Sequence, residues 1–317
     1  MKVLIVGELN VDLVLQNPLA FPVPGRETLV KDISLTLGSS SAICAAALTK
    51  LGEQVTFVGK VGCDSWGEFC LASIRAIGID ASSVICDHSL KTGITVSITS
   101  AKDRALVTYL GSIAALRAYE IPQALLAAHR HLHVSSFFLQ RALRPGLHSL
   151  FSRAHQQGLT TSVDPGFDPE ERWGRDLIDV LKEVDIFLPN ETELAGILGT
   201  ADRTAALHAL DNGRTTIVAK LGTDGCMAIH KGAVVSVPAF AVEPVDTTGA
   251  GDTFNAGFLH AWLEGKTLIE AMRFGAACGA LATLGLGGTA NQPTVDQAQA
   301  FIAAQADHRP SAMEVSR

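Results

Sequence analysis

Residues 245–258 have the sequence VDTTGAGDTFNAGF, in which a glycine turn is followed by an acidic residue and a run of small residues. Small residues let the backbone approach a ligand closely and let successive N–H groups point in one direction. The run predicts a helix that continues to Leu263, and the start of a helix adds unpaired N–H groups and the positive end of its dipole. The stretch therefore predicts a binding site for an anion such as phosphate.

Asp252 is the acidic residue at the mouth of this expected anion site. A carboxylate beside a bound phosphoryl group can accept the proton of a hydroxyl that attacks phosphorus. The residues alone support a second interpretation equally well, in which Asp252 only caps the helix that follows the turn.

The string at 246–254, DTTGAGDTF, resembles the C-terminal motif of the ribokinase-like carbohydrate kinases, also called the pfkB type. Few unrelated chains contain the whole string. The resemblance implies that Gly249, Ala250 and Gly251 form the anion hole and that Asp252 is the catalytic base.

The same resemblance implies the fold. We expect an α/β domain over residues 1–305, built as a ribokinase-like three-layer α/β/α sandwich with a mostly parallel central sheet and a small β-sheet lid. The lid segments are expected near residues 13–37 and 91–111, and residues 306–317 are expected to form a C-terminal tail. Family members often pair through the lid, so the resemblance also implies a homodimer.

The composition fits a compact α/β enzyme. The chain has 317 residues, 47% of them hydrophobic, which is enough for a large core in one or two domains. The net charge is −7 without a block of basic residues, so we expect no nucleic-acid partner. The apolar start is interrupted by Glu8 and Asp12 and therefore predicts a buried strand, not a signal peptide or a membrane span. We expect a cytoplasmic protein.

The cysteines, at positions 44, 63, 70, 86, 226 and 278, include no C-x-x-C pair. Their spacing does not indicate a zinc site. We expect all six to be small buried thiols in a reducing compartment.

Polar side chains follow the first expected strand, residues 2–7. Open α/β sheets bind ligands at the carboxyl ends of their strands. Asn10 and Asp12 alternate onto one face there, and their side chains can hydrogen-bond neighbouring sugar hydroxyls. A turn would use the same two residue types, but the resemblance places sugar binding on both.

Gly38, Ser39 and Ser40 lead into an alanine-rich helix expected at 43–51. The family pattern has two glycines here and then an asparagine that holds a sugar hydroxyl. This chain has Ser39 at the second glycine and Ile43 at the asparagine, so either Ser40 or Ser41 compensates or the substrate is less polar on that side. We retain Gly38, Ser39 and Ser40 as candidate substrate-binding residues.

Asn190 and Glu193 follow an expected strand at 184–188 and share one face of a helix start. The resemblance implies that they place Mg²⁺ and phosphate, with Glu193 acting through water. A capping box would use the same residues at the same spacing.

The remaining nucleotide contacts are implied by the family's Lys-x-Gly-x-x-Gly turn and by the 246–254 motif. They are Lys220, Gly222, Gly225, Thr248 and Gly251. Asp246 and Thr248 are also candidate ligands of a monovalent cation, K⁺, beside the anion hole. The turn at 285–288 is implied to line the adenine pocket.

Two further groups have no settled role. Asp164 follows a strand, but Gly166 replaces the asparagine of the family's Asp-x-Asn. His129, His131 and His133 alternate at the start of a strand expected at 132–139, which suggests a metal site, yet no acidic or cysteine partner is near in sequence.

The resemblance therefore implies, and we expect, an ATP- and Mg²⁺-dependent kinase that phosphorylates a hydroxyl of a small sugar or sugar-like substrate. A nucleoside kinase of the same fold is the nearest alternative, because the apolar Ile43 suits a base. A silent sugar or nucleotide sensor is more remote. A dinucleotide oxidoreductase is disfavoured, since residues 7–12 lack G-x-G-x-x-G.

Overall fold

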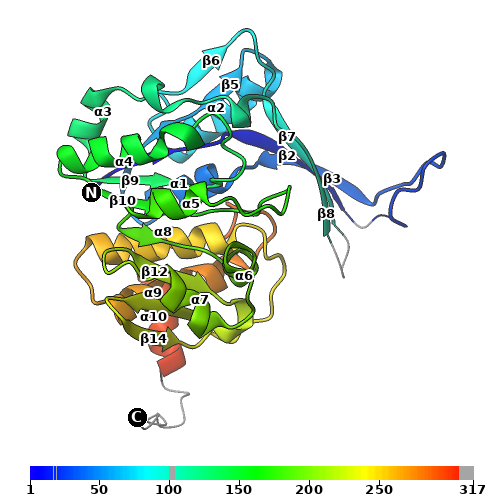
Figure 1. Cartoon of the computed structure of the whole chain (residues 1–317). Helices are drawn as coiled ribbons and strands as arrows, with labels where there is room; N and C mark the ends of the chain where they lie inside the picture. The colour runs from blue at the N-terminus through cyan, green and yellow to red at the C-terminus, as the bar shows by residue number, and fades with distance from the viewer. Residues whose placement is uncertain (17, 19, 100–103, 307–317) are drawn as a thin grey trace.

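The computed structural model describes residues 1–16, 18, 20–99 and 104–306. Most of the expected tail at 306–317 lies outside these residues, as do residues 100–103 of the expected lid segment at 91–111. Figure 1 shows a layered body with a small sheet extending from one side. Within the described residues, no helix combines the length and the apolar character needed to cross a membrane.

The large sheet has the strand order β14-β13-β12-β11-β10-β9-β1-β4. In that order the strands span Ala233–Val237, Cys226–His230, Thr216–Lys220, Ile186–Phe187, Thr160–Val163, His131–Val134, Lys2–Val6 and Gln54–Val58. The pairs from β4 to β12 are parallel, and β13 and β14 join antiparallel at one edge. The expected mostly parallel central sheet is confirmed.

Two hydrophobic cores cover the two faces of this sheet. In β1, Val3 and Ile5 belong to one core, whereas Leu4 and Val6 belong to the other. Burial on both faces explains why the strand is a continuous apolar run.

The helices divide between the two cores. Those on the first core are α1 (Ser40–Lys50), α2 (Ser65–Ile77), α8 (Ala250–Leu263), α9 (Leu268–Ala282) and α10 (Val295–Ala306). Those on the second core are α3 (Gln123–Ala128), α4 (Leu147–Gln156), α5 (Asp176–Leu181), α6 (Glu191–Leu198) and α7 (Arg203–Leu210).

The small sheet has the order β3-β2-β7-β8, with strands Asp32–Leu37, Asn10–Gln16, Gly93–Thr99 and Arg104–Tyr109. It comes from the two regions in which the sequence predicted lid strands. Asn10 and Asp12 are the first residues of β2, so the small sheet begins directly at the carboxyl end of β1.

The chain leaves the large sheet after β4, because β5 (Lys60–Gly62) pairs with β6 (Ile85–Asp87) in a separate two-stranded sheet. One strand prediction was wrong in extent. The strand expected at 132–139 ends at Val134, because Ser136 has a φ of +52° and turns the chain.

The cysteine prediction also needs correction. Cys44, Cys70, Cys226 and Cys278 are buried free thiols, as expected. Cys63 and Cys86 are exposed and form a disulfide, with Cα atoms 5.3 Å apart. The pairing of strand β5 with strand β6 brings these two residues together. The spacing of the cysteines in the sequence did not reveal this pairing.

Two of the three alternating histidines, His131 and His133, lie in strand β9 of the large sheet, and His129 ends helix α3. Ser162 Oγ lies 2.7 Å from both His131 Nε2 and His133 Nδ1. Burial lowers the pKa of His131 to about 3 and that of His133 to about 4, so both rings are neutral at pH 7. Their serine and threonine partners support a structural role.

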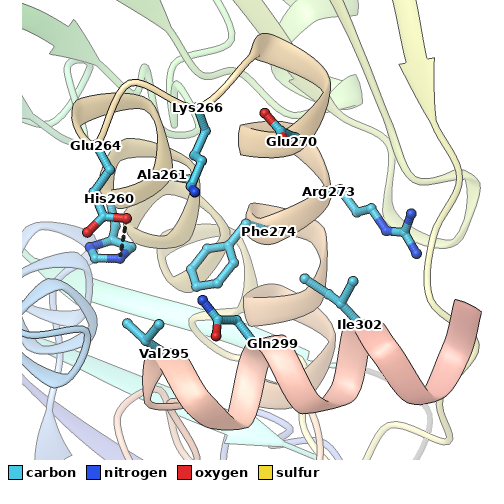
Figure 2. Close-up of a pocket in the computed structure, with 10 residues that line it drawn as sticks. All are labelled: His260, Ala261, Glu264, Lys266, Glu270, Arg273, Phe274, Val295, Gln299 and Ile302. Atoms are coloured by element: carbon cyan, nitrogen blue, oxygen red, sulfur yellow. Dashed lines mark ion pairs between the residues drawn. The ribbon is translucent and has the colours of Figure 1, made fainter.

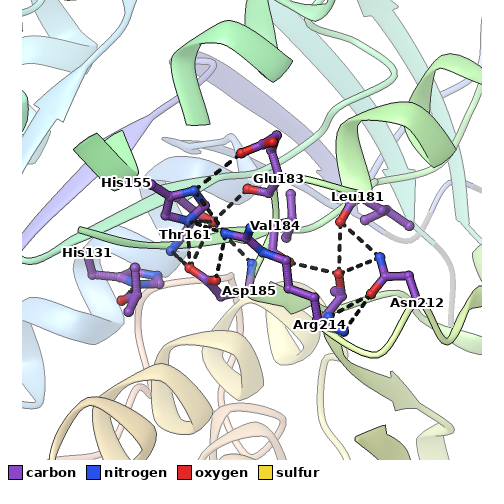
Figure 3. A network of polar contacts seen from close by, with 11 residues as sticks. His131, His155, Thr161, Leu181, Glu183, Val184, Asp185, Asn212 and Arg214 are labelled. Atoms are coloured by element: carbon purple, nitrogen blue, oxygen red, sulfur yellow. Dashed lines mark hydrogen bonds and ion pairs between the residues drawn. The ribbon is translucent and has the colours of Figure 1, made fainter. Parts of the chain in front are cut away.

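A polar network lies at the amino ends of β10 and β11 (Figure 3). Asp185 Oδ2 accepts a hydrogen bond from Thr161 N at 2.8 Å and lies 2.9 Å from His155 Nε2. Arg214 donates to Asp185 Oδ1 at 3.4 Å. Because these strands run parallel to β1, their amino ends lie at the end of the sheet opposite to Asn10 and Asp12. The network stabilises that end.

We expect Phe258→Ala to lower the free energy of unfolding by about 3–5 kcal/mol. Phe258 is fully buried in α8 and stacks between Phe254 and Trp262, with ring centroids 6.5 and 5.8 Å away. Tyr119→Ala is the control, because Tyr119 is 76% exposed and its loss should cost about 0.5 kcal/mol or less. Urea unfolding measures both, and equal losses would contradict the assignment of Phe258 to the core.

Candidate active site

A cavity of about 660 Å³ lies at the carboxyl end of β1, between the first turns of α1 and α8 and one face of the small sheet. Polar side chains make up more than half of the residues that line it. The predicted site residues that line it are Asn10, Asp12, Ser39, Ser40, Asp246, Thr248, Gly249 and Asp252. Residues from sequence positions more than 230 apart thus meet around one space.

Asn10 and Asp12 form one wall of the cavity. Asn10 is 4% exposed, and its Nδ2 donates to Asp12 Oδ1 at 3.1 Å. Gly38 packs directly behind them, since a Cβ at Gly38 would lie 2.1 Å from Asp12 Oδ1. The side chains that the sequence assigned to the acceptor are therefore held side by side, and Gly38 allows their position.

Ser39 and Ser40 connect this wall to α1. Ser39 has a φ of +81°, where the family pattern has glycine, and its Oγ accepts a hydrogen bond from Ala42 N at 3.0 Å. Ser39 therefore caps α1 in place of a bare glycine turn. Ser40 donates a hydrogen bond to the carboxylate of Asp252, which links the starts of α1 and α8.

Gly249 is the N-cap of α8 and has a φ of +72°. A Cβ there would lie 2.9 Å from both Gly288 O and Ile43 Cγ2, so the turn requires glycine. Ala250 N donates to Thr247 O at 3.3 Å. Ile43 is buried beneath this turn, which explains how an apolar residue fits where the family pattern has asparagine.

Asp252 lies in the first turn of α8 and lines the cavity. Burial raises its pKa well above the usual aspartate value, and the negative charge of Asp164 adds to the effect. The pKa of a general base is useful when it approaches the working pH.

A buried ion pair supports α8 from below. Lys220 Nζ donates to Asp164 Oδ2 at 2.6 Å and to Asn255 Oδ1 at 3.0 Å, and Asn255 Nδ2 donates to Asp164 Oδ2 at 2.6 Å. Burial lowers the pKa of Lys220, but the charges of Asp164 and Glu193 outweigh burial and raise it. Burial raises the pKa of Asp164, but Lys220 outweighs burial and lowers it.

Asn190 and Glu193 form a reciprocal capping box at the start of α6. Asn190 N donates to Glu193 Oε2 at 2.7 Å, and Glu193 N donates to Asn190 Oδ1 at 2.8 Å. The capping alternative is therefore present in the structure. Burial, helped by the charge of Asp164, raises the pKa of Glu193 to about 7.

Asp246 connects two loops beside the cavity. Its Oδ1 accepts hydrogen bonds from Thr248 N and Oγ1 at 2.9 and 2.7 Å, and its Oδ2 accepts one from Gly287 N at 2.9 Å. The predicted turn at 285–288 thus lies against the anion-hole loop.

Several predicted residues lie outside the cavity lining. Within the described part of the chain these are Gly38, Ala250, Gly251, Asn190, Glu193, Lys220, Gly222 and Gly225. Gly225 has a φ of +92°, and a Cβ there would lie 2.1 Å from Val237 O, so this turn needs glycine for its own packing. Nucleotide contacts at these positions stay predictions.

Sequence reasoning missed two groups of lining residues. The first is Glu8 and Ser136, which hydrogen-bond each other. The second is a set of hydroxyl side chains on the small sheet: Ser34, Thr36, Thr95, Ser97, Thr99 and Thr108. Their alternation along the strands was the available signal, because residues i and i+2 share a face.

A second cavity, of about 180 Å³, lies between α8, α9 and α10 (Figure 2). His260, at its edge, lies 2.7 Å from Glu53 Oε1 through Nδ1. His260 is eight residues beyond Asp252 in α8, which is about 12 Å along the helix axis. This cavity is therefore distinct from the candidate active site.

Comparisons with known proteins agree with this geometry. A family model, pfkB family carbohydrate kinase, matches residues 1–295. An uncharacterized sugar kinase of Archaeoglobus fulgidus is 33% identical over 72% of this chain and 90% of its own length. An ATP-dependent ribose-1-phosphate kinase of Halopiger xanaduensis is 30% identical over 96% of this chain and 99% of its own. A crystal structure of ribokinase from Thermotoga maritima matches with a TM-score of 0.80 at 25% identity, covering 96% of this chain and 99% of that one.

We expect Lys220→Met to lower the free energy of unfolding by about 3–5 kcal/mol at pH 7, because Asp164 would stay buried without its counter-ion. The loss should shrink at acid pH, where the unpaired Asp164 takes up a proton. Urea unfolding across pH measures both effects. Lys182→Met is the control, since the Lys182–Asp179 pair is exposed and contributes about 0–1 kcal/mol. Equal losses in the two variants would show that Asp164 does not need Lys220.

Proposed function

Because the chain belongs to the pfkB family of carbohydrate kinases, we propose that it transfers the γ-phosphoryl group of ATP to a hydroxyl of a small sugar or sugar-like acceptor. The observation that carries the proposal is that Asp252, in the first turn of α8, borders the same cavity as Asn10 and Asp12. A base, an anion-binding helix start and a pair of hydroxyl-binding side chains are the groups that this transfer requires.

Asn10 and Asp12 orient the acceptor in this mechanism, and Asp252 takes the proton of the attacking hydroxyl. The proton moves late in a loose transition state, because a carboxylate is too weak a base to ionise an alcohol beforehand. The N–H groups from Gly249 to Asp252, at the start of α8, stabilise charge on the transferring phosphoryl group. The small sheet excludes water that would otherwise hydrolyse ATP.

The acidic groups near Lys220, which include Asp164 and Glu193, suit a site for Mg²⁺. Within the described residues, no three His, Cys, Asp or Glu side chains are grouped so that they could hold a metal alone. Mg²⁺ commonly binds through one or two carboxylates together with substrate phosphates. Burial and, to a smaller extent, the charge of Asp164 raise the pKa of Glu193, and a nearby dication would offset the repulsion from Asp164. Glu193, through water, and Asn190 would place Mg²⁺, which would neutralise phosphate charge when bound.

A monovalent cation is proposed for the loop pair that Asp246 connects, with Asp246 and Thr248 as its ligands. Carbonyl groups of the adjoining 285–288 turn would complete such a site. The oxygen chemistry of these groups suits K⁺.

We expect Asp252→Asn to lower acceptor-dependent ADP release by about 10²- to 10⁴-fold. The assay supplies ATP and Mg²⁺ with ribose, fructose, 2-keto-3-deoxygluconate, ribose 1-phosphate, adenosine, inosine and cytidine. Asp296→Asn is the matched control, because Asp296 is an exposed first-turn aspartate of α10. Turnover on nucleosides alone would assign the nucleoside-kinase alternative. A wild-type chain that binds sugar or nucleotide without turnover would support the sensor alternative.

The raised pKa of Asp252 gives a second expectation. Activity should fall on the acid side at a pH above the usual aspartate value of about 3.9, because the base must be ionised. A raised folded-state pKa also means that ionisation destabilises the fold as pH increases. Asp252→Asn should therefore melt at a higher temperature than the wild type, with a gap that widens from acid to neutral pH. A gap that is constant with pH would contradict the raised pKa.

We also propose a homodimer formed through the small sheet. Its outer face combines apolar side chains on neighbouring strands, with Leu13 paired to Leu35 and Val96 to Val107. Val107 is 63% exposed, Tyr109 52% and Ile33 58%, which is unusual for large apolar side chains gathered on one face.

We expect Val107→Lys to reduce the particle mass measured by light scattering from twice to once the 33.3 kDa of the chain. The reason is that a charge would be buried without a partner in such an interface. Val234→Lys on the edge strand β14 is the control and should leave the mass unchanged. A wild-type particle of 33.3 kDa would refute the dimer.

A further inference from the structure

Glu8 is a buried carboxylate at the end of β1 that the proposed mechanism does not use. It is 3% exposed and lines the cavity. Its Oε1 accepts hydrogen bonds from Ser41 N at 3.2 Å and Ser136 Oγ at 2.9 Å, and its Oε2 accepts them from Ser41 Oγ at 2.6 Å and Gln140 Nε2 at 3.2 Å. Each carboxylate oxygen accepts about two hydrogen bonds, so Glu8 has little capacity left for a ligand.

The contact with Glu8 determines what Ser136 can offer to a ligand. A serine hydroxyl has one proton and two lone pairs. Ser136 uses its O–H to donate a hydrogen bond to Glu8. Toward the cavity its oxygen therefore presents lone pairs only. Ser136 can therefore accept a hydrogen bond from an acceptor hydroxyl but cannot donate one.

Ser136 has a strained backbone conformation. Its φ of +52° is uncommon for a residue with a side chain, and such conformations persist where the surroundings fix them. Gly166 packs against it, because a Cβ at Gly166 would lie 2.9 Å from Ser136 Cα. Gly166 is the residue that replaces the asparagine of the family's Asp-x-Asn, so this departure makes room for Ser136.

We propose that Ser136 determines acceptor specificity by accepting a hydrogen bond from one hydroxyl of the acceptor, and that Glu8 is the positioning residue that orients it. This inference rests on the proposed function. It accounts for the substitution of asparagine by Ile43, since a hydroxyl-binding group is supplied from the loop after β9 instead of from α1. The favoured acceptors are those with a hydroxyl at that position, and analogues lacking it leave Ser136 unpaired.

The test compares the acceptor found in the ADP-release panel, or the panel sugar or nucleoside that binds in calorimetry if none is phosphorylated, with its monodeoxy analogues, one for each hydroxyl that is not phosphorylated. Leaving a buried hydrogen-bonding group unpaired reduces affinity by about 5- to 150-fold. We expect the wild type to discriminate by this ratio against the analogue that lacks the hydroxyl bound by Ser136. In Ser136→Ala that ratio should fall to about one, while the ratios for hydroxyls bound elsewhere stay as in the wild type.

Two variants of Glu8 separate its positioning role from a general effect of charge. Glu8→Ala should abolish the same ratio as Ser136→Ala, because Ser136 would lose the group that orients its proton. Glu8→Gln should retain the ratio. The amide oxygen of the new glutamine can still accept from Ser136. Its NH₂ can donate to Ser41 Oγ and, after rotation of the Gln140 amide, to Gln140 Oε1, which has no hydrogen-bond partner among the described residues.

Ser73→Ala is the matched control, because Ser73 lies in α2 and donates to Phe69 O outside the cavity. If Ser136→Ala unfolds, Ser136→Gly replaces it, since glycine adopts a positive φ without strain. If Glu8→Ala unfolds, the positioning role of Glu8 is judged from Glu8→Gln alone. Unchanged ratios in Ser136→Ala or Ser136→Gly would overturn the inference, as would an equal loss for every analogue or a lost ratio in Glu8→Gln.

Dissociation constants from calorimetry, measured on the same proteins and analogues, separate this inference from the proposed function. Ratios that depend on Ser136 in binding, without ADP release, would refute the kinase proposal and keep the inference. Turnover with ratios that do not depend on Ser136 would support the kinase proposal and refute the inference about Ser136. A chain that neither binds nor phosphorylates any acceptor would refute both.

Discussion

Lys220 and Asp164 form a buried ion pair at 2.6 Å that joins β12 to the loop after β10 and, through Asn255, to α8. The start of α8 is fixed by this pair from below and by Gly249 from above, where the turn packs against Gly288 and Ile43. A charged pair of this kind is stable only with close geometry and satisfied partners. The orientation of Asp252 therefore depends on contacts made by residues at 164, 220 and 255.

The sequence was most informative where structure follows from local chemistry. Strand β1 is buried on both faces and is a plain apolar run, and the glycine at 249 is required by a positive φ. The features that the sequence did not predict depend on pairing between strands that are distant in the chain. Lys60 to Gly62 leaves the large sheet because it pairs with β6, and the same pairing brings Cys63 to Cys86. Neither partner is visible from local sequence.

The candidate site divides in the same way. Asn10, Asp12 and Asp252 were identified because their spacing or motif is local, and the structure places them around one cavity. Asp164 and Glu8 could not be interpreted, because their partners are more than 30 residues away. Asn190 and Glu193 show a limit of motifs, since the same two side chains make the capping box that a helix start needs without any ligand.

The two hydrophobic cores are separated by the large sheet, and this separation has a practical consequence. Helices α1 and α8, which contain the serines at 39–40 and Asp252, pack on the first core. Helices α3, α4, α5 and α7 pack on the second core and contribute no residue to the lining of the cavity. Substitutions that improve packing beneath these four helices can make the protein more heat-resistant without moving the reacting groups. An engineer seeking a durable enzyme would begin on that side.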